Sequence, residues 1–400
     1  MTTSSPASSS DSQAFQLLDE RIQRWIWREG WTALRDAQEK ATPALIDADR
    51  DVIVAAATAA GKTEAAFFPI LTHLLRHEPD IGSVLYIGPL KALINDQWSR
   101  LSELCDSLDI PVVAWHGDIA ASKKHRFVKD SRGVLLITPE SLEALFVRRG
   151  TAMSGLMSRL RYVVIDELHA FIGSERGKQL QSLLHRLERT VGRRLPLVGL
   201  SATLGDMGLA ASFLRPDGAG SVELIVAKSG GQELKVLIKG YVEKPPRVKE
   251  GPDIEDPEME DLVKGSTLEV AEQLYKALRG SNNLVFPNSR RQVEIYADLL
   301  RRACERNNVP NEFWPHHGSL SKEFREEAER ALKDGTKPAT AICTTTLELG
   351  IDIGSVKSVC QIGPPPSVAS LRQRLGRSGR RKGEPRSEER RVGKECSLPC

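Results

Sequence analysis

Short runs of apolar and β-branched residues recur along the first half of the chain, and each is followed by a segment with helical periodicity. The runs are DVIVAAAT, SVLYIGP, GVLLITPES, RYVVIDE and PLVGLSAT. They are nearly continuous in apolar residues rather than alternating, which is typical of strands covered by helices on both faces. Alternation of strand and helix predicts parallel strands joined by crossover helices. The pattern therefore predicts an α/β fold.

A polar stretch interrupts this pattern near the middle of the chain. Residues 240–266, GYVEKPPRVKEGPDIEDPEMEDLVKGS, are rich in proline and charge and lack a clear apolar period, as in an interdomain loop or insertion. Strand-like runs resume with NNLVFPNS, TAICTTT and SVKSVCQIG. Because 400 residues exceed what one hydrophobic core usually organises, we predict α/β lobes over residues 14–226 and 268–385, joined by a linker or insertion at 227–267.

The two ends of the chain differ from these lobes. Residues 1–13, MTTSSPASSSDSQ, are serine-rich and lack the basic and apolar regions of a secretory signal, so we predict a disordered tail. Residues 386–396 read RSEERRVGKEC, which closely resembles the conceptual translation of a sequencing-adapter oligonucleotide. We therefore expect residues 386–400 to be non-native and the natural protein to continue; a genuine basic, disordered tail is the alternative.

Composition narrows the class of protein. Apolar residues make up 40% of the chain and charged residues 27%, and no apolar run approaches the roughly 18 residues of a membrane span, so we expect a cytoplasmic protein with no membrane partner. Six cysteines without CxxC spacing favour reduced thiols over a zinc site or a disulfide framework. A net charge of +3 does not decide whether the partner is a nucleic acid.

The stretch AAATAAGKTEA, residues 55–65, combines features of a phosphate-binding loop and of an alanine-rich helix. Gly61, Lys62 and Thr63 follow a predicted strand and precede a predicted helix, which is the context that a phosphate loop requires. In such a loop, backbone N–H groups face the phosphates, the lysine reaches the β- and γ-phosphate oxygens, and the threonine hydroxyl holds Mg²⁺. GKT alone is a weak signal, so the start of an alanine-rich helix stays open as the alternative.

In RYVVIDELHAF, an apolar strand leads directly into two acids, Asp166 and Glu167. In parallel sheets the ligand crevice lies at the carboxyl ends of the strands, so Asp166 can meet the Mg²⁺ held by Thr63 while Glu167 polarises a water molecule. The alternative is a strand that merely ends in solvated acids. The combination of GKT with this acid pair favours a nucleotide site.

Further motifs follow in order, and their series resembles the superfamily 2 helicases of the DExD/H-box type. The first lobe contains GWTALRDAQ (residues 30–38, Q motif), AATAAGKT (56–63, motif I), GPLKALINDQ (88–97, motif Ia), TPES (138–141, motif Ib), DELH (166–169, motif II) and SAT (201–203, motif III). The second contains LVFPNSRRQVE (284–294, motif IV), TTTLELGIDIG (344–354, motif V) and QRLGRSGR (373–380, motif VI). The resemblance implies two RecA-like lobes in tandem with an ATP cleft between them.

The amino-acid sequences of several motifs are similar to those of the Lhr-type, or large helicase-related, group of this superfamily. These are GWTALRDAQ, WHGD (115–118), ERGKQL (175–180), HHGSLSKEFREEAE (316–329) and TLELGIDIG. This second resemblance implies 3′-to-5′ translocation on single-stranded nucleic acid and unwinding of DNA or RNA–DNA duplexes in DNA repair. It also implies further domains beyond the second lobe.

The family resemblance assigns roles to residues of the nucleotide site. Gln38 would read the adenine edge, and Asp352 would contact the ribose. Gln373 and Arg374 would link the ATP site to motif II. The residues that correspond to the phosphate loop are Thr58, Ala59, Ala60, Gly61, Lys62 and Thr63.

Phosphoryl transfer spreads negative charge over the γ-phosphate oxygens, so a catalyst needs cations there in addition to Lys62 and Mg²⁺. Arg377 and Arg380 suit this task, because their spacing places both on one helical face. The resemblance makes them fingers that reach across the interlobe cleft. A solvated basic face or a nucleic-acid patch is the alternative. By the same resemblance, Ser201 and Thr203 of motif III would couple hydrolysis to movement.

Sequence-independent binding of a nucleic acid needs backbone contacts from hydroxyls, amides and cations. Six residues supply this mixture, and by resemblance they lie on one strand-tracking surface; taken singly, each could be an ordinary loop residue. They are Lys91, Thr138, Ser289, Arg290, Gly318 and Thr344.

The function predicted from these motifs is that of a monomeric, ATP- and Mg²⁺-dependent helicase or translocase. Its partner would be single-stranded or partly duplex nucleic acid, with DNA favoured over RNA. Two alternatives stay open, a nucleic-acid-stimulated ATPase that remodels complexes without unwinding and an inactive, truncated nucleic-acid-binding module.

Overall fold

The chain forms two compact units, Met1–Gly230 and Gly231–Cys400. The computed structural model describes residues 12–56, 61–78, 81–117, 127–202, 206–227, 234–242, 265–347, 354, 356–366, 368–378 and 386–393. Within these ranges no helix combines the length and the hydrophobicity that crossing a membrane requires.

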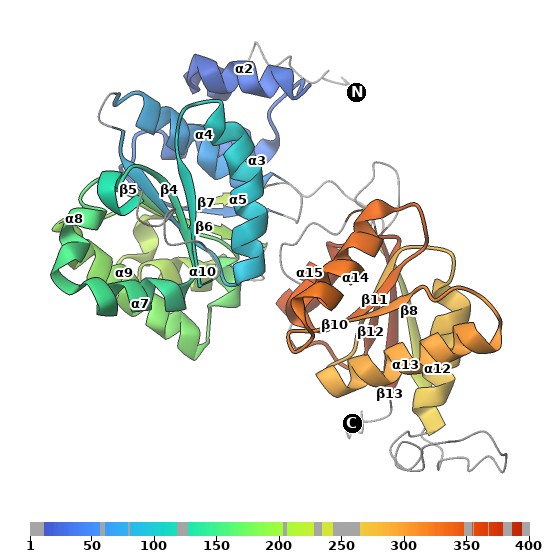
Figure 1. Ribbon diagram of the computed structural model, residues 1–400. Coiled ribbons are helices and arrows are strands. Elements are labelled where there is room, and N and C mark those ends of the chain that lie inside the picture. Colours follow the sequence, from blue (N-terminus) through green and yellow to red (C-terminus); the bar gives the residue numbers. More distant parts are fainter. Residues whose placement is uncertain are drawn as a thin grey trace. The chain divides into compact units, whose positions relative to one another are not determined.

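The first unit is built on a seven-stranded parallel sheet with the strand order β3-β4-β2-β5-β6-β1-β7 (Figure 1). The strands are β1 (Asp51–Ala55), β2 (Ser83–Ile87), β3 (Val112–Trp115), β4 (Gly133–Ile137), β5 (Leu160–Ile165), β6 (Leu197–Ser201) and β7 (Val222–Val226). The helices are α1 (Gln13–Leu17), α2 (Glu20–Arg28), α3 (Asp36–Leu45), α4 (Lys62–Leu75), α5 (Lys91–Asp106), α7 (Pro139–Arg149), α8 (Met153–Met157), α9 (Glu175–Val191) and α10 (Met207–Leu214), with 3₁₀ turns at Gly150–Ala152, Leu168–Ala170 and Ala219–Ser221.

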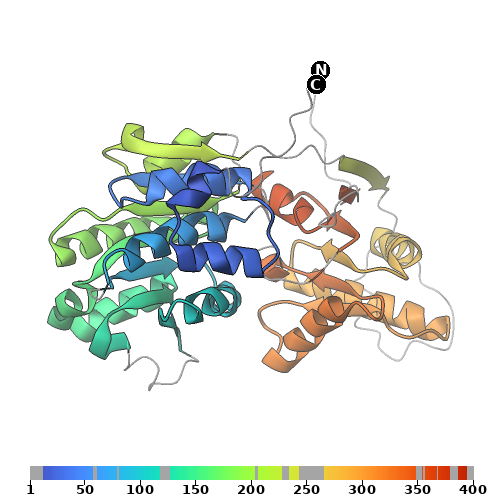
Figure 2. The ribbon, with the colours of Figure 1, turned by 90° about the horizontal axis from the view of Figure 1, so that it is seen from above.

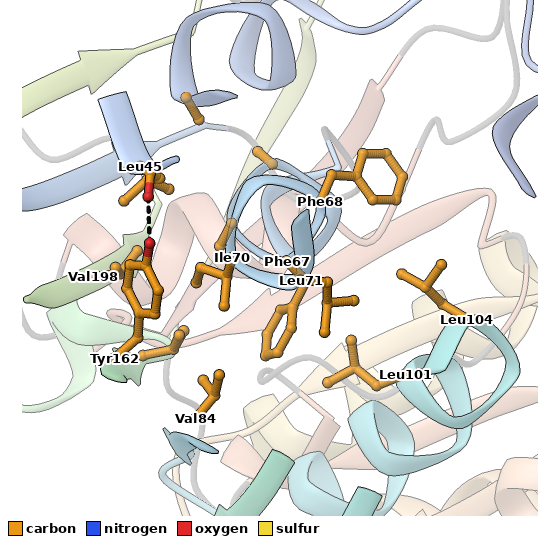
Figure 3. Close-up of a cluster of buried hydrophobic side chains, with 14 of the residues drawn as sticks. Leu45, Phe67, Phe68, Ile70, Leu71, Val84, Leu101, Leu104, Tyr162 and Val198 are labelled. Atoms are coloured by element: carbon orange, nitrogen blue, oxygen red, sulfur yellow. Dashed lines mark hydrogen bonds between the residues drawn. The ribbon is translucent and has the colours of Figure 1, made fainter. Parts of the chain in front are cut away.

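Helices cover both faces of this sheet, as Figures 1 and 2 show. Successive strand residues alternate between two hydrophobic clusters: Val52 and Val54 of β1 belong to the cluster that includes α3 and α4, whereas Ile53 belongs to the one that includes α7 and α9. In Figure 3, Phe67 and Leu71 of α4 lie on the side of the helix toward Val84 of β2. Burial of both faces explains why the strands read as continuous apolar runs.

Local sequence signals set the ends of several helices. Ser174 caps α9 by accepting a hydrogen bond from the Gly177 N–H, and the helix ends before Gly192, which adopts φ +75°. Thr138 caps α7 in the same way, with Pro139 at the first helical position. Thr138 directly follows Ile137, the last residue of β4, and therefore stands at the carboxyl end of that strand, where a ligand of the sheet would lie.

The second unit contains a six-stranded parallel sheet with the order β10-β11-β9-β12-β13-β8. Its strands are β8 (Leu234–Tyr241), β9 (Asn283–Phe286), β10 (Phe313–His316), β11 (Thr340–Cys343), β12 (Ser358–Ile362) and β13 (Arg386–Gly393). Its helices are α12 (Gly265–Leu278), α13 (Arg290–Arg306), α14 (Lys322–Asp334) and α15 (Val368–Leu375), with a 3₁₀ turn at Thr345–Leu347. The predicted α/β class with two parallel-sheet lobes is confirmed.

The structure differs from the predicted boundaries at two places. The predicted linker, 227–267, contains β8, which pairs with β13 in the second sheet, and it overlaps the start of α12. The predicted linker began too early in the chain. The proline- and charge-rich stretch starts only after Tyr241, and the preceding LKVLIKGY contains β-branched residues typical of a strand. The predicted non-native tail supplies β13, which pairs with β12 and β8. Its origin stays a prediction.

Candidate nucleotide and nucleic-acid sites

The phosphate-loop motif lies between β1 and α4, in the predicted strand–loop–helix context. Gly61 precedes the helix with φ +77°, a conformation that favours glycine, and a Cβ built there would stand 2.6 Å from Gln38 Nε2. Lys62 begins α4, and its Nζ donates a hydrogen bond to the Ala56 carbonyl at 3.0 Å. Thr63 is buried in the same first turn. Thr58, Ala59 and Ala60 lie outside the described residues.

The acid pair follows β5, which is separated from β1 only by β6. Asp166 is 5% exposed; its Oδ1 accepts from the Glu167 N–H at 2.8 Å, and its Oδ2 accepts from the Tyr86 hydroxyl. Glu167 adopts φ +48°, an uncommon conformation for a residue with a side chain, which turns the chain sharply after the strand. The strand order therefore brings this pair and the phosphate loop to one edge of the sheet.

Burial and a neighbouring charge perturb Asp166. Burial, followed by the negative charge of Glu167, raises the pKa of Asp166 to about 6, while the Tyr86 hydrogen bond and the Lys62 charge act in the opposite direction. A carboxylate that is desolvated in this way gains from a cation brought close to it. Carboxylate and hydroxyl oxygens are suitable Mg²⁺ ligands, so Asp166 and Thr63 fit the ion that a nucleotide triphosphate carries.

Few protein ligands are available for a metal by itself. Among the described residues no group of three or more His, Cys, Asp or Glu side chains is placed to hold one. Mg²⁺ is usually bound through one or two protein oxygens together with phosphates and water.

Gln38 presents a buried amide beside the phosphate loop. The side chain is 0% exposed, and its Oε1 accepts from the Arg35 N–H at 2.9 Å. Its Nε2 has no hydrogen-bond partner in the described part of the chain, although it stands next to Gly61. A buried donor without a partner is costly, and an acceptor on a bound base would satisfy it.

Arg35 is a neighbour of this site that the motif analysis missed. Its side chain lies 3.4 Å from the position of a Cβ on Gly61, and its guanidinium lies 5.8 Å from the centre of the Trp31 ring. Arg35 is the residue before α3 begins, and helical spacing could not have placed it beside Gly61.

His169 connects the acid pair to Ser201. The Ala202 N–H donates to His169 Nδ1 at 3.2 Å, which leaves the Nε2 proton facing Glu167, whose Oε2 is 3.5 Å away. His169 Nδ1 is also 3.2 Å from the Ser201 hydroxyl. The structure thus places Ser201 at the turn that carries the acids, and His169 is a second residue that sequence reasoning missed. Thr203 lies outside the described residues.

A cavity of about 570 Å³ opens in the second unit. Four of the residues predicted to contact nucleic acid line it: Ser289, Arg290, Gly318 and Thr344. Asn288, Thr345, Thr346, Pro364, Pro365 and Pro366 line it as well.

The N-terminus of α13 contributes to this cavity. Ser289 caps the helix by accepting from the Gln292 N–H at 3.2 Å, and Arg290 Nη1 donates to the Ser319 hydroxyl at 2.7 Å. A helix N-terminus together with an arginine and hydroxyl groups forms a site for phosphate oxygens. Residues from four separate sequence motifs line this one cavity.

Lys91 and Thr138 occupy corresponding positions in the first unit. Lys91 begins α5 after β2, and Thr138 follows β4, the neighbouring strand. Both therefore stand at the carboxyl edge of the sheet. Their roles stay predictions.

Arg377 of the last motif lies outside a helix, which differs from the prediction. We expected Arg377 and Arg380 on one helical face, but α15 ends at Leu375 and Arg377 follows it with 2% exposure. The sequence QRLGRSGR contains two glycines, which favour an early helix end. Asp352 and Arg380 lie outside the described residues.

Arg374 is part of the cavity of the second unit. It is 2% exposed, donates to the Gln361 side chain, lies over the Phe286 ring at 4.6 Å, and lines the cavity beside Arg290. Gln373 is buried next to it. Their predicted role toward the ATP site stays a prediction.

Comparisons with known proteins agree with this geometry. Residues 35–209 match the family model described as DEAD/DEAH box helicase, and residues 266–382 match the helicase conserved C-terminal domain. The chain is 30% identical over 391 residues to the ATP-dependent helicase Lhr-Core of Saccharolobus solfataricus, covering 92% of this chain and 42% of that protein. It is 32% identical over 378 residues to Lhr-Core of Methanothermobacter thermautotrophicus, covering 87% of this chain and 41% of that protein.

Solved structures show the same likeness. The Mycobacterium smegmatis helicase Lhr bound to ssDNA and AMP-PNP matches with a TM-score of 0.74 and 28% identity, over 95% of this chain and 48% of that one. The DUF1998 helicase MrfA bound to DNA and AMPPNP matches with a TM-score of 0.75 and 26% identity, over 95% of this chain and 51% of that one. The chain thus spans about half the length of these proteins, or less.

Proposed function

The chain belongs to the superfamily 2 helicases of the DExD/H-box type and resembles their Lhr-type members, and from this premise we propose that it couples ATP hydrolysis to movement along nucleic acid. The observation that carries the proposal is the sheet order β5-β6-β1. It brings residues 61–63 of the phosphate loop and the acid pair Asp166 and Glu167 to one edge of the sheet. This edge would supply the groups that bind the phosphates and the Mg²⁺.

The residues of this edge divide the work. Lys62, released from the Ala56 carbonyl, would bind the β- and γ-phosphate oxygens, and the Gln38 amide would hydrogen-bond the adenine. Thr63 and Asp166 would hold Mg²⁺, which supplies positive charge to the transferring phosphoryl group. Glu167 would orient the attacking water, with its carboxylate kept in place by His169.

Residues of the second unit complete the proposal. By resemblance, Arg377 and Arg380 would stabilise the charge that develops on the γ-phosphate, and Asp352 would contact the ribose. Hydrolysis would then require closure of the two units. The cavity lined by Ser289, Arg290, Gly318 and Thr344 would bind the phosphate backbone of a single strand together with Lys91 and Thr138.

The substrate and direction are proposed from the relatives. M. smegmatis Lhr is bound to ssDNA and MrfA to DNA, which favours DNA over RNA as the partner. From the resemblance to the Lhr-type group we propose 3′-to-5′ translocation and a role in DNA repair, and from the composition of the chain a cytoplasmic location. An ATPase that remodels nucleic-acid complexes without unwinding them is the second candidate.

ATP turnover measured with and without single-stranded DNA tests the proposal. We expect stimulation by the strand, and loss of turnover in Lys62→Ala with the strand still bound. A strand-displacement assay on a duplex with a 3′ overhang separates the two candidates. A rate that single-stranded DNA leaves unchanged would contradict coupled movement, and Lys62→Ala with unaltered turnover would contradict the assigned ATP site.

A further inference from the structure

Tyr86 is a fully buried residue of β2 that hydrogen-bonds a site residue from within the core. Tyr86 lies opposite Val164, and Ile87 lies opposite Ile165, in the pairing of β2 with β5. Asp166 follows β5, and its N–H donates to the Ile87 carbonyl at 2.9 Å. Strand pairing therefore determines where the Tyr86 hydroxyl stands relative to the Asp166 carboxylate.

Two donors hold this carboxylate, one at each oxygen. The Tyr86 hydroxyl donates to Oδ2, and the Glu167 N–H donates to Oδ1 at 2.8 Å. The tyrosine ring is itself immobilised, because it is 0% exposed and its centre lies 6.2 Å from that of Phe67. Asp166 therefore cannot rotate about its side-chain bonds without losing one of these hydrogen bonds.

We propose that Tyr86 is a positioning residue whose hydroxyl holds the Asp166 carboxylate in the orientation that receives Mg²⁺ together with the nucleotide. The inference rests on the proposed function, in which Asp166 and Thr63 hold that ion. A carboxylate oxygen that accepts one hydrogen bond keeps a further lone pair for the metal or for a water bound to it. Fixing the carboxylate in advance removes an ordering cost from Mg²⁺ binding.

The distinction to be drawn is between positioning and simple core stability. Tyr162, on β5, is also fully buried, but its hydroxyl donates to the Leu45 carbonyl at the end of α3, at 2.6 Å (Figure 3). Tyr162→Phe removes a buried tyrosine hydrogen bond without touching Asp166. It is therefore the matched control for Tyr86→Phe, which removes only the hydroxyl that reaches the carboxylate.

The experiment measures binding of a fluorescent, non-hydrolysable ATP analogue to the full chain, first in EDTA and then across a Mg²⁺ titration. For Tyr86→Phe we expect the parent's affinity in EDTA, but a Mg²⁺ midpoint raised about 10- to 100-fold, as is typical when an outer-shell partner of a metal ligand is lost. The ATPase rate of this variant should recover at high Mg²⁺. Tyr162→Phe should keep the parent's midpoint and show only a lower melting temperature.

A Mg²⁺ midpoint in Tyr86→Phe that matches the parent's would overturn the inference, as would an equal shift in Tyr162→Phe. If Tyr86→Phe does not fold, Tyr86→Met, whose flexible side chain adapts to irregular space and has no hydroxyl, is measured instead with the same two outcomes. Failure of the proposed function is visible separately, because the parent itself would then not bind the analogue in Mg²⁺.

Discussion

Asp51 begins β1, at the end of the strand away from the phosphate loop, and holds several elements of the first unit together. Its side chain is 2% exposed. Its oxygens accept hydrogen bonds from Arg215 Nε and Nη2 at 2.7 and 3.0 Å, from the Leu197 N–H at 2.8 Å and from Arg194 at 2.6 Å. Replacing Asp51 by alanine removes these acceptors. The Leu197 N–H and Arg215 Nε, both in the interior, then lose their hydrogen bonds to the carboxylate.

The cost follows from which partners remain. Breaking a buried ion pair by removing one member costs about 3–5 kcal/mol. Arg215 keeps Glu188 at 2.9 Å, and Arg194 is 63% exposed, so its ion pair adds little. We therefore expect Asp51→Ala to lower the free energy of unfolding of the first unit by about 3 kcal/mol, or its melting temperature by roughly 6–12 °C.

The loss should depend on pH in a defined direction. Burial by itself raises the pKa of Asp51, but hydrogen bonds from Arg215, Leu197 and Arg194 outweigh it and hold the pKa below its usual value. A depressed folded-state pKa means that the stabilisation is fully present above about pH 4, the ordinary value, and is lost as the pH falls through the folded-state pKa. The parent and the variant should therefore differ at pH 7 and converge in acid.

Urea unfolding followed by tryptophan fluorescence measures this, because five of the six tryptophans lie in the first unit and only Trp314 lies in the second. Asp49→Ala is the matched control: Asp49 is half exposed and pairs with Arg50, also exposed, so it should cost about 0.5 kcal/mol or less. Equal effects of the two substitutions at pH 7, or a difference that grows in acid, would refute the reasoning.

Three further substitutions test other parts of the structure. Gln38→Ala removes the buried amide beside Gly61 and should lower the preference for ATP over GTP about tenfold in competition binding; an unchanged preference would place base recognition elsewhere. Arg290→Ala should lower the slope of log affinity for single-stranded DNA against log salt by about one, whereas a parallel line would exclude a phosphate contact. Gly177→Ala places a Cβ 1.9 Å from the Phe171 carbonyl and should destabilise the first unit by about 2 kcal/mol or more. An unchanged melting temperature in calorimetry would contradict this expectation.

The pattern of the sequence determined the fold class and the local setting of the motifs. Continuous apolar runs such as RYVVIDE predicted doubly covered parallel strands, because burial on both faces removes the polar half of the usual alternation. Because these apolar runs marked the strands, GKT could be placed directly after β1 and the acid pair directly after β5. The position of Ser289 before α13 was likewise readable, since an N-cap serine has a local hydrogen-bonding cause.

Other features depended on which strands became neighbours. The pairing of β2 with β5 brings Tyr86 to Asp166 from 80 residues away, and no local period or propensity contains that information. The contact of His169 with Ala202 follows from the pairing of β5 with β6, and the meeting of Gln38 with Gly61 follows from the packing of α3 against α4. The inclusion of β8 in the second sheet also came from backbone pairing, with β13. The sequence by itself determined which chemical groups stand at the ends of strands, and the tertiary structure decided which of them touch, because strand order joins residues that are distant along the chain.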